Sequence, residues 1–228
     1  MKLRRIILSM AVLAIAAGCA VRVWSQAKPE EKDPVLKMSQ VPQKVQQAIK
    51  TYASPAEIKK ITKGDVDGTM AYEFEIEKGG RKAEVSITPD GKLLTSEEEI
   101  PPSEVPEAAR KVMDAHAAGG KVVSTEKVFE NGKTAFGAVI EKGGKQSEIS
   151  VAPDGKLTGS EEDIPLSEVP EAARKTIDAQ AAGGKIISTK KVLEDGKTVF
   201  AAVFEKGGRQ TEITVAPDGK LVDTEVIK

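Results

Sequence analysis

A fixed internal period of 64 residues constrains the fold of this chain more than any other feature. The period is kept by the Val-Pro pairs at Val41, Val105 and Val169, the Gly-Gly pairs at Gly79, Gly143 and Gly207, and the Pro-Asp-Gly turns at Pro89, Pro153 and Pro217. Self-similarity at a fixed spacing is the signature of repeated structural units. The sequence therefore predicts three tandem units, over residues 41–101, 102–165 and 166–228.

The first 27 residues differ in kind from the repeats. Lys2, Arg4 and Arg5 precede an apolar run and then small residues, which is the layout of an export signal. The run is shorter than the roughly 20 residues that a membrane-spanning helix needs. We expect an export signal over 1–27 and a polar tether over 28–40, and hence a protein that is periplasmic or anchored in the cell envelope.

Cys19, the only cysteine, lies where the apolar run ends. Two interpretations stay open: Cys19 is lipidated, as in a bacterial lipoprotein signal, or the signal is cleaved after Ala27. Membrane contact is expected only in the first case, through a lipid anchor at Cys19. The formal net charge is −1 and acidic and basic residues are interspersed, so no nucleic-acid partner is expected.

Each unit has the pattern of one helix followed by four strands. In the second copy Val105, Ala109 and Val112 recur at helical spacing, and Gly119-Gly120 ends the segment. In the first copy Tyr72, Phe74 and Ile76 alternate with acidic residues, which indicates a half-buried strand. Gly-Gly pairs and Pro-Asp-Gly turns then separate further strands.

The predicted fold class is α+β, with three tandem units that each pack one helix on a four-stranded antiparallel sheet. Acidic, proline-terminated segments such as Glu97-Glu98-Glu99-Ile100-Pro101 are predicted to connect the units.

The copies differ on the outer side of the second strand. Glu73 and Glu75 of the first copy become small or apolar residues in the other two, which indicates that something covers this face there. Internal packing is one interpretation, and a surface that binds a partner is the other. The residues of this candidate partner-binding face are Gly137, Val139, Glu148, Ala201, Val203 and Glu212.

No catalytic or metal site is predicted. His116 is the only histidine and has no second histidine or mature-chain cysteine to complete a metal set. We interpret it as a side chain at the flank of a helix. Because no nucleophile motif is present either, we expect no enzymatic activity and no cofactor.

The segments "VPEAARK", "YEFEIEKGG" and "EVSITPDGKLL" resemble the PepSY-like family of exported bacterial domains, a group described as β-lactamase-inhibitor-like. The resemblance covers residues 40–228, once per copy, although two copies are more usual in the family. It implies a non-enzymatic module, and the wider class includes domains thought to restrain peptidases.

From the residues and this resemblance we predict a non-enzymatic exported module that binds a protein or peptide in the cell envelope. The specific form of this hypothesis is inhibition or regulation of a peptidase or other hydrolase. The alternative is a structural or sensory envelope lipoprotein in which the repeats act as a spacer.

Overall fold

The computed structural model describes residues 34–66, 68–130, 132–194 and 196–227. The predicted export signal over 1–27, with Cys19, and the first part of the predicted tether, up to residue 33, lie outside these residues. None of the helices in the described ranges is long and apolar enough to cross a membrane. The chain divides into two compact parts at residue 160, so that residues 34–160 form one part and residues 161–227 belong to the other.

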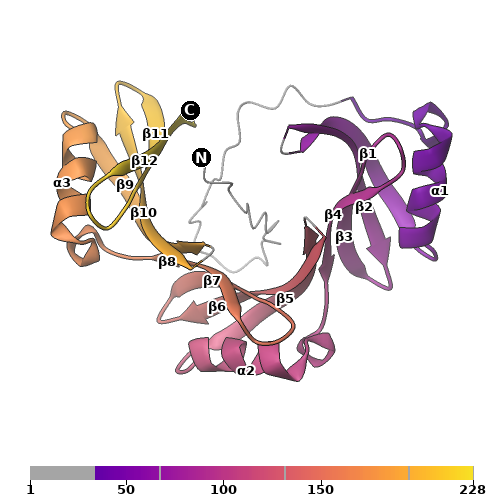
Figure 1. Ribbon diagram of the computed structural model, residues 1–228, viewed down its shortest axis with the longest axis horizontal. Helices are drawn as coiled ribbons and strands as arrows, with labels where there is room; N and C mark the ends of the chain where they lie inside the picture. Colours follow the sequence, from indigo (N-terminus) through magenta and orange to yellow (C-terminus); the bar gives the residue numbers. More distant parts are fainter. Residues whose placement is uncertain (1–33, 67, 131, 195, 228) are drawn as a thin grey trace. The chain divides into compact units, whose positions relative to one another are not determined.

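Each repeat contributes one α-helix followed by four β-strands (Figure 1). The first repeat contains α1 (Gln43–Tyr52), β1 (Glu57–Val66), β2 (Thr69–Lys78), β3 (Arg81–Ile87) and β4 (Leu93–Glu99). The second contains α2 (Glu107–His116), β5 (Lys121–Glu130), β6 (Lys133–Lys142), β7 (Lys145–Val151) and β8 (Leu157–Asp163). The third contains α3 (Glu171–Gln180), β9 (Lys185–Glu194), β10 (Lys197–Lys206), β11 (Arg209–Val215) and β12 (Leu221–Val226).

A proline starts each helix. Pro42, Pro106 and Pro170 occupy the N-cap positions, and a short 3-10 turn precedes each of them, at Met38–Gln40, Pro102–Glu104 and Leu166–Glu168. Proline is tolerated at a helix start because the N–H that it lacks would have no partner inside the helix. Residues four apart then share one face, as Ala109 and Met113 do in α2, and this face is buried.

The strands follow one another in chain order, β1 to β12, in one twelve-stranded antiparallel sheet. The predicted fold class, three units that each have a four-stranded sheet of their own, is therefore wrong. The segment Glu97–Glu99, predicted to be a connector, belongs to β4, and β4 pairs with β5 of the next repeat from Thr95 with Glu130 to Glu99 with Glu126. The physical reason is that β4 would otherwise expose a row of unpaired backbone groups at a sheet edge.

Side-chain hydrogen bonds extend this pairing beyond the strand. The Thr125 hydroxyl donates to the Ile100 carbonyl oxygen at 2.6 Å, and the Ile100 N–H donates to the Thr125 carbonyl oxygen at 3.0 Å. In residues 161–227, Thr189 and Ile164 make the same two bonds at 2.6 and 3.1 Å. These threonine hydroxyls are buried, so the bonds satisfy groups that would be costly to leave unpaired.

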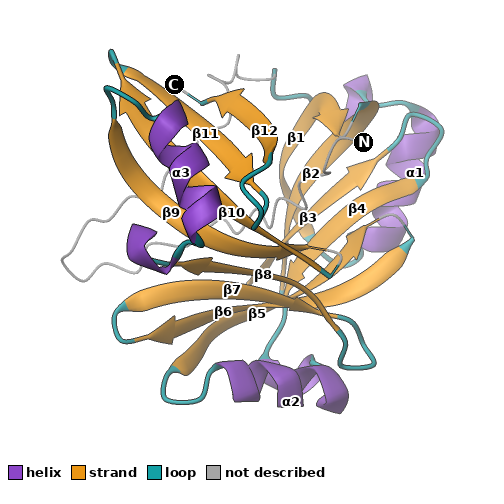
Figure 2. Ribbon diagram, turned by 60° about the vertical axis from the view of Figure 1, so that its left-hand side comes forward, coloured by secondary structure: helices purple, strands orange, loops and turns teal. Residues whose placement is uncertain are grey.

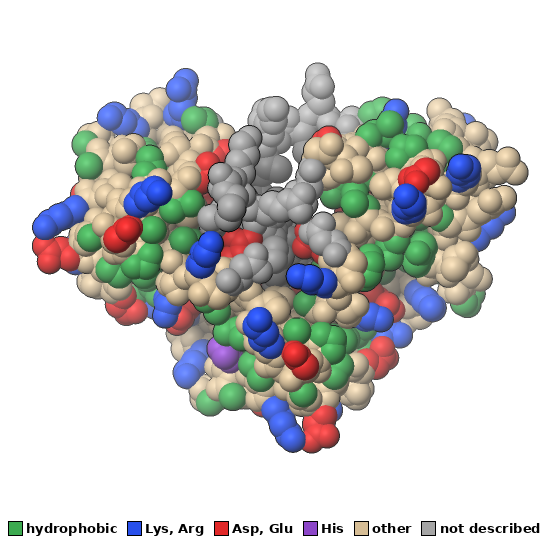
Figure 3. Space-filling view, viewed as in Figure 1, with side chains coloured by type: hydrophobic (Ala, Val, Ile, Leu, Met, Phe, Trp, Pro, Cys, Tyr) green, Lys and Arg blue, Asp and Glu red, His purple; other side chains and the backbone are tan. Residues whose placement is uncertain are grey.

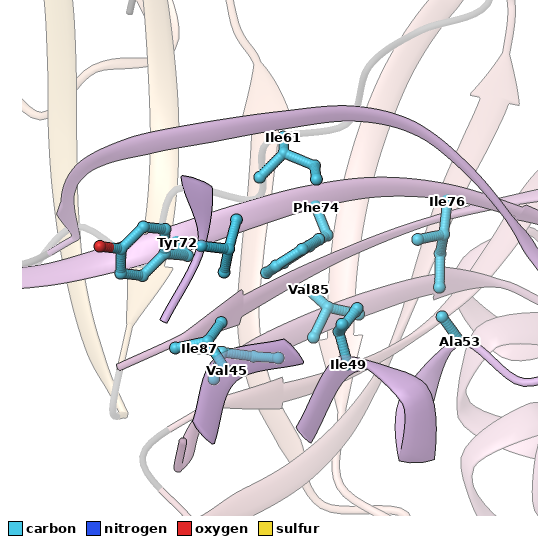
Figure 4. Packing of buried hydrophobic residues seen from close by; sticks show 10 residues of the cluster. Val45, Ile49, Ala53, Ile61, Tyr72, Phe74, Ile76, Val85 and Ile87 are labelled. Atoms are coloured by element: carbon cyan, nitrogen blue, oxygen red, sulfur yellow. The ribbon is translucent and has the colours of Figure 1, made fainter. Parts of the chain in front are cut away.

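Each helix covers one face of its own strands (Figure 2). In the first repeat Val45 and Ile49 of α1 pack on Phe74, Val85 and Ile87 (Figure 4). Ala109 and Met113 of α2 pack on a cluster from β6 and β7, and Ala173 and Ile177 of α3 on a cluster from β10 and β11. The cores are therefore equivalent in position, although their residues differ between repeats.

The Pro-Asp-Gly turns bring glycine against the helix. Gly91, Gly155 and Gly219 have φ of +88°, +89° and +88°, a conformation that side chains other than glycine rarely adopt. A Cβ at Gly219 would also lie 2.7 Å from the carbonyl oxygen of Ala172 in α3. The turn therefore requires glycine both for its backbone conformation and for its approach to the helix.

We expect Gly219→Ala to lower the free energy of unfolding by about 2 kcal/mol, because it combines the strain of a positive φ with a backbone clash. Gly208→Ala is the matched control, since Gly208 has φ +77° and nothing within 4 Å of the added Cβ. Urea unfolding of both variants measures the difference. Equal losses in the two variants would contradict the close packing of the turn on α3.

Candidate functional site

The sheet in residues 34–160 has one face without a helix. The register places Ser96 of β4 and Phe129 of β5 on the same face as Val85 of β3, so α1 and α2 cover the same side. The opposite side is called the helix-free face here. It carries Glu73, Glu75, Glu84, Glu97, Glu99, Glu126, Val128, Glu130, Gly137, Val139 and Glu148.

The residues predicted for the partner-binding face lie opposite the helices. Val139 of β6 pairs directly with Glu148 of β7, and in residues 161–227 Val203 of β10 pairs with Glu212 of β11. Val139 is only 4% exposed and Ala201 only 8%, whereas Val203, Glu148 and Glu212 are half-buried. Val139 and Ala201 are therefore buried on this face, and the other three side chains are partly accessible.

Gly137 makes room for a glutamate. The side chain of Glu126, from β5, lies over Gly137, and a Cβ at Gly137 would be about 2.5 Å from Glu126 Oε1 and 2.8 Å from its Cγ. The first and third repeats have Glu73 and Ala201 at the equivalent position. The Glu126 residue is 9% exposed. Sequence comparison singled out Gly137, but it did not find that Gly137 accommodates Glu126.

Glu126 is one member of a carboxyl pair at the first junction, which we define as the pairing of β4 with β5. Glu97 stands opposite Val128 and Glu126 stands opposite Glu99, so Glu97 and Glu126 are diagonal neighbours across the two strands. In the described part of the chain, neither carboxyl group has a hydrogen-bond or ion-pair partner. Further acids surround them: Glu84 faces Glu97 from β3, and Glu148 approaches Glu126 from β7.

Burial and these neighbours favour the protonated forms. Burial raises the pKa of Glu97 from 4.5 to about 8, and the charges of Glu126, Glu84 and Glu130 add to the effect. Burial likewise raises the pKa of Glu126 to about 7, with contributions from Glu148 and Glu99. Because ionisation of either carboxyl opposes ionisation of the other, the pair titrates as a unit.

Glu84 shares this environment to a smaller degree. Burial is again the main cause that raises its pKa, and Glu75 adds to it, while Lys60 and a hydrogen bond with Glu73 act in the opposite direction. Lys60 forms an ion pair with Glu75 at 2.8 Å. This ion pair joins β1 to β2, and β3 lies between it and the strand that carries Glu97.

At the second junction, which we define as the pairing of β8 with β9, a lysine occupies the position equivalent to Glu126. Glu161 of β8 and Lys190 of β9 stand 64 positions after Glu97 and Glu126, and these two side chains form an ion pair. Lys190 is 27% exposed there. One junction thus contains a carboxylate with an ammonium, and the other contains two carboxyl groups at the equivalent positions.

The sequence contains a signal for this pair that the analysis of second strands did not detect. Glu97 and Glu161 are the same residue in successive repeats, but Glu126 is replaced by a residue of opposite charge, Lys190. This difference in charge becomes informative only when β4 and β5 are known to be neighbours. The prediction of three separate sheets excluded that pairing.

His116 lies at the C-terminal end of α2 and is exposed, as its interpretation as a helix-flank residue anticipated. Its Nδ1 is 3.1 Å from the Val112 carbonyl oxygen, a contact within the helix. Among the described residues, no three His, Cys, Asp or Glu side chains are placed to hold a metal ion. Charged side chains of both signs are interspersed over the surface seen in Figure 3.

Comparison with known families bears on the first repeat. Residues 24–95 match the family model described as "Putative beta-lactamase-inhibitor-like, PepSY-like". The first repeat is PepSY-like. This confirms, for the first repeat, the resemblance found in the sequence, and the 64-residue period relates the other two repeats to the first.

Solved structures resemble parts of this chain. A BLIP-like protein from Bacteroides fragilis is 21% identical, with 51% of this chain and 82% of that chain covered and a TM-score of 0.41. A "putative periplasmic" protein from Bacteroides eggerthii is 20% identical, with 51% and 85% covered and a TM-score of 0.42. The YpeB C-terminal domain from Bacillus megaterium is 14% identical, with 81% and 96% covered and a TM-score of 0.25. No curated protein matches the sequence. These likenesses assign no activity or partner to this chain.

Proposed function

We propose that this protein is a non-enzymatic, exported module that binds a protein or peptide partner in the cell envelope, with the helix-free face of residues 34–160 as the binding surface. The observation that carries the proposal is the carboxyl pair on that face, which lacks the cation that the second junction has. Surfaces that only need to stay in solution do not require partly buried, uncompensated acids, because such groups cost stability.

The PepSY-like match supports a binding module, and the layout of residues 1–27 supports export. Inhibition of a peptidase or other hydrolase is the specific form of the proposal. In that form, the partner's active-site region would contact the helix-free face. Measured activity of an envelope hydrolase in the presence of saturating protein would test this form directly.

Site-specific photo-crosslinking tests the binding surface. Ser124 is exposed and pairs with Val139 on the helix-free face, whereas Ala115 is exposed on α2. A photoreactive residue at Ser124 is expected to give a discrete crosslinked product in the native envelope, and the same residue at Ala115 is not. If neither position gives a product, or if both give the same one, the helix-free face is not the binding surface and the spacer alternative is favoured.

Val139→Glu is unsuitable for this experiment. Because Val139 is 4% exposed, a charge there would be buried without a partner and would lower stability whether or not the face binds anything. Ser124 avoids this difficulty because its side chain is already in solvent.

A further inference from the structure

The two junctions differ in the sign of the charge at one of six equivalent positions. Six acidic residues surround the first junction on the helix-free face, namely Glu84, Glu97, Glu99, Glu126, Glu130 and Glu148. Their equivalents 64 positions later are Glu148, Glu161, Asp163, Lys190, Glu194 and Glu212. Five of the six positions remain acidic, and only Glu126 is replaced by a base. At the second junction Lys190 forms an ion pair with one of these acids, Glu161.

We infer that the Glu97–Glu126 pair accepts a lysine or arginine side chain that belongs to the partner, in the place that Lys190 supplies from within the chain at the second junction. This inference rests on the proposed function and names the chemistry of its partner. A cation placed between two partly buried carboxylates forms charge-assisted hydrogen bonds that neither carboxylate makes within the described residues.

The pair is accessible to such a side chain. Among the described residues, every fully buried polar side-chain atom has a hydrogen-bond partner. The carboxyl oxygens of Glu126 have none, so they must keep some contact with solvent although the residue is 9% exposed. Gly137 lies beneath the Glu126 side chain and has no Cβ, which would otherwise occupy the space where this side chain lies.

The geometry favours an ammonium or guanidinium group over a metal ion. No set of three acidic, histidine or cysteine side chains in the described part of the chain is arranged to coordinate a metal. The ion pair of Glu161 with Lys190 shows that a cationic side chain at one of these two strand positions reaches the carboxylate at the other. Arginine would suit the pair as well, because its planar group can bind two carboxylates at once.

Binding should release protons. Near neutral pH the raised pKa values keep Glu97 and Glu126 partly protonated, and a cation would favour their ionised forms. The other titratable groups that face the pair are Glu84 from β3, Glu99 from β4, Glu130 from β5 and Glu148 from β7. All four are acids, so none of them can take the place of a cation.

Calorimetric titration of the full exported chain with the peptide acetyl-Ala-Lys-Ala-Lys-Ala-amide tests the inference, with norleucine in place of lysine in the control peptide. We expect saturable binding of the lysine peptide only, tighter as the pH rises from about 6 to about 8, with proton release seen as a dependence of the heat on the buffer. Equal binding of the two peptides, or an affinity that does not change with pH, would overturn the inference.

Charge-swap variants locate the site. Glu126→Lys, which copies the second junction, should abolish binding while the protein stays folded, and Glu126→Gln should weaken it by about tenfold. Conversely, Lys190→Glu with Ala201→Gly recreates the pair in the third repeat and should add a second binding site. Undiminished binding by Glu126→Lys would exclude the pair as the acceptor.

Two further outcomes separate this inference from the function on which it rests. If Glu126→Lys leaves the envelope crosslink from Ser124 unchanged, the binding function stands and the cationic contact is wrong. If Lys28→Gln with Lys32→Gln tightens peptide binding, lysines of this chain compete for the pair, and the assignment to a partner is overturned.

Discussion

Phe74→Ala is expected to lower the free energy of unfolding of residues 34–160 by about 4 kcal/mol, because it removes a whole ring from a closed core. Phe74 of β2 is 0% exposed and belongs to the core cluster that also contains Val45 and Ile49 of α1 and Val85 and Ile87 of β3 (Figure 4). Urea unfolding followed by circular dichroism measures the loss. A cost below about 1 kcal/mol would mean that the site collapses around the smaller residue.

The other repeats sharpen this prediction. Ala138 and Ala202 occupy the position equivalent to Phe74, and both are buried. Alanine is therefore compatible with the backbone at this position, and the cost in the first repeat comes from the loss of the buried ring and the cavity that it leaves. Met70→Ala is the control on the same strand, since Met70 is 45% exposed and its truncation is expected to change stability by no more than about 0.5 kcal/mol.

The carboxyl pair is expected to make the protein less stable as the pH rises. Glu97 and Glu126 have pKa values raised from 4.5 to about 8 and about 7, so the folded chain keeps protons that the unfolded chain releases in this range. The free energy of unfolding therefore falls between pH 4.5 and about 8 and is constant above it. We expect a loss of about 3 kcal/mol from the pair, after discounting for the solvent that reaches it.

The double variant Glu97→Gln with Glu126→Gln isolates this effect from other titrating groups. It should lack the pair's share of the pH dependence and should be more stable than the native chain at pH 8 or above, as measured by urea unfolding at several pH values. Glu161→Gln is the matched control at the second junction, where it breaks the ion pair with Lys190 and should not produce a gain at high pH. Identical pH profiles for the native chain and the double variant would refute the shifted titration.

The local structure was predictable because its signals are local. Alternation through Tyr72, Phe74 and Ile76 indicated β2, and helical spacing with a terminal Gly-Gly pair indicated α2. The arrangement of the strands into one sheet was not predictable, because Glu97-Glu98-Glu99 has the composition of a solvated loop. Its place in β4 depends on pairing with Glu126 to Glu130 of the next repeat, which no short window of sequence shows.

The candidate site was found only in part for the same reason. Gly137 and Val139 were selected because their own strand had lost its outward-facing acids, a difference that is visible within one element. The role of Gly137 depends on Glu126 of β5, and the significance of Glu126 depends on Glu97 of β4. Comparing the charge at each position across the period would have found Glu126 and Lys190, but only the sheet register shows that they face Glu97 and Glu161.

The most direct test of the account is a pH titration of the Glu97 and Glu126 side-chain carboxyl carbons by nuclear magnetic resonance. The account predicts that both titrate well above 4.5, near the values of about 8 and about 7, and that Glu126→Lys returns Glu97 toward the range of an ordinary carboxylate. If both carboxyls of the native chain titrate near 4.5, the first junction holds no uncompensated pair. The proposed cation site would then have no basis.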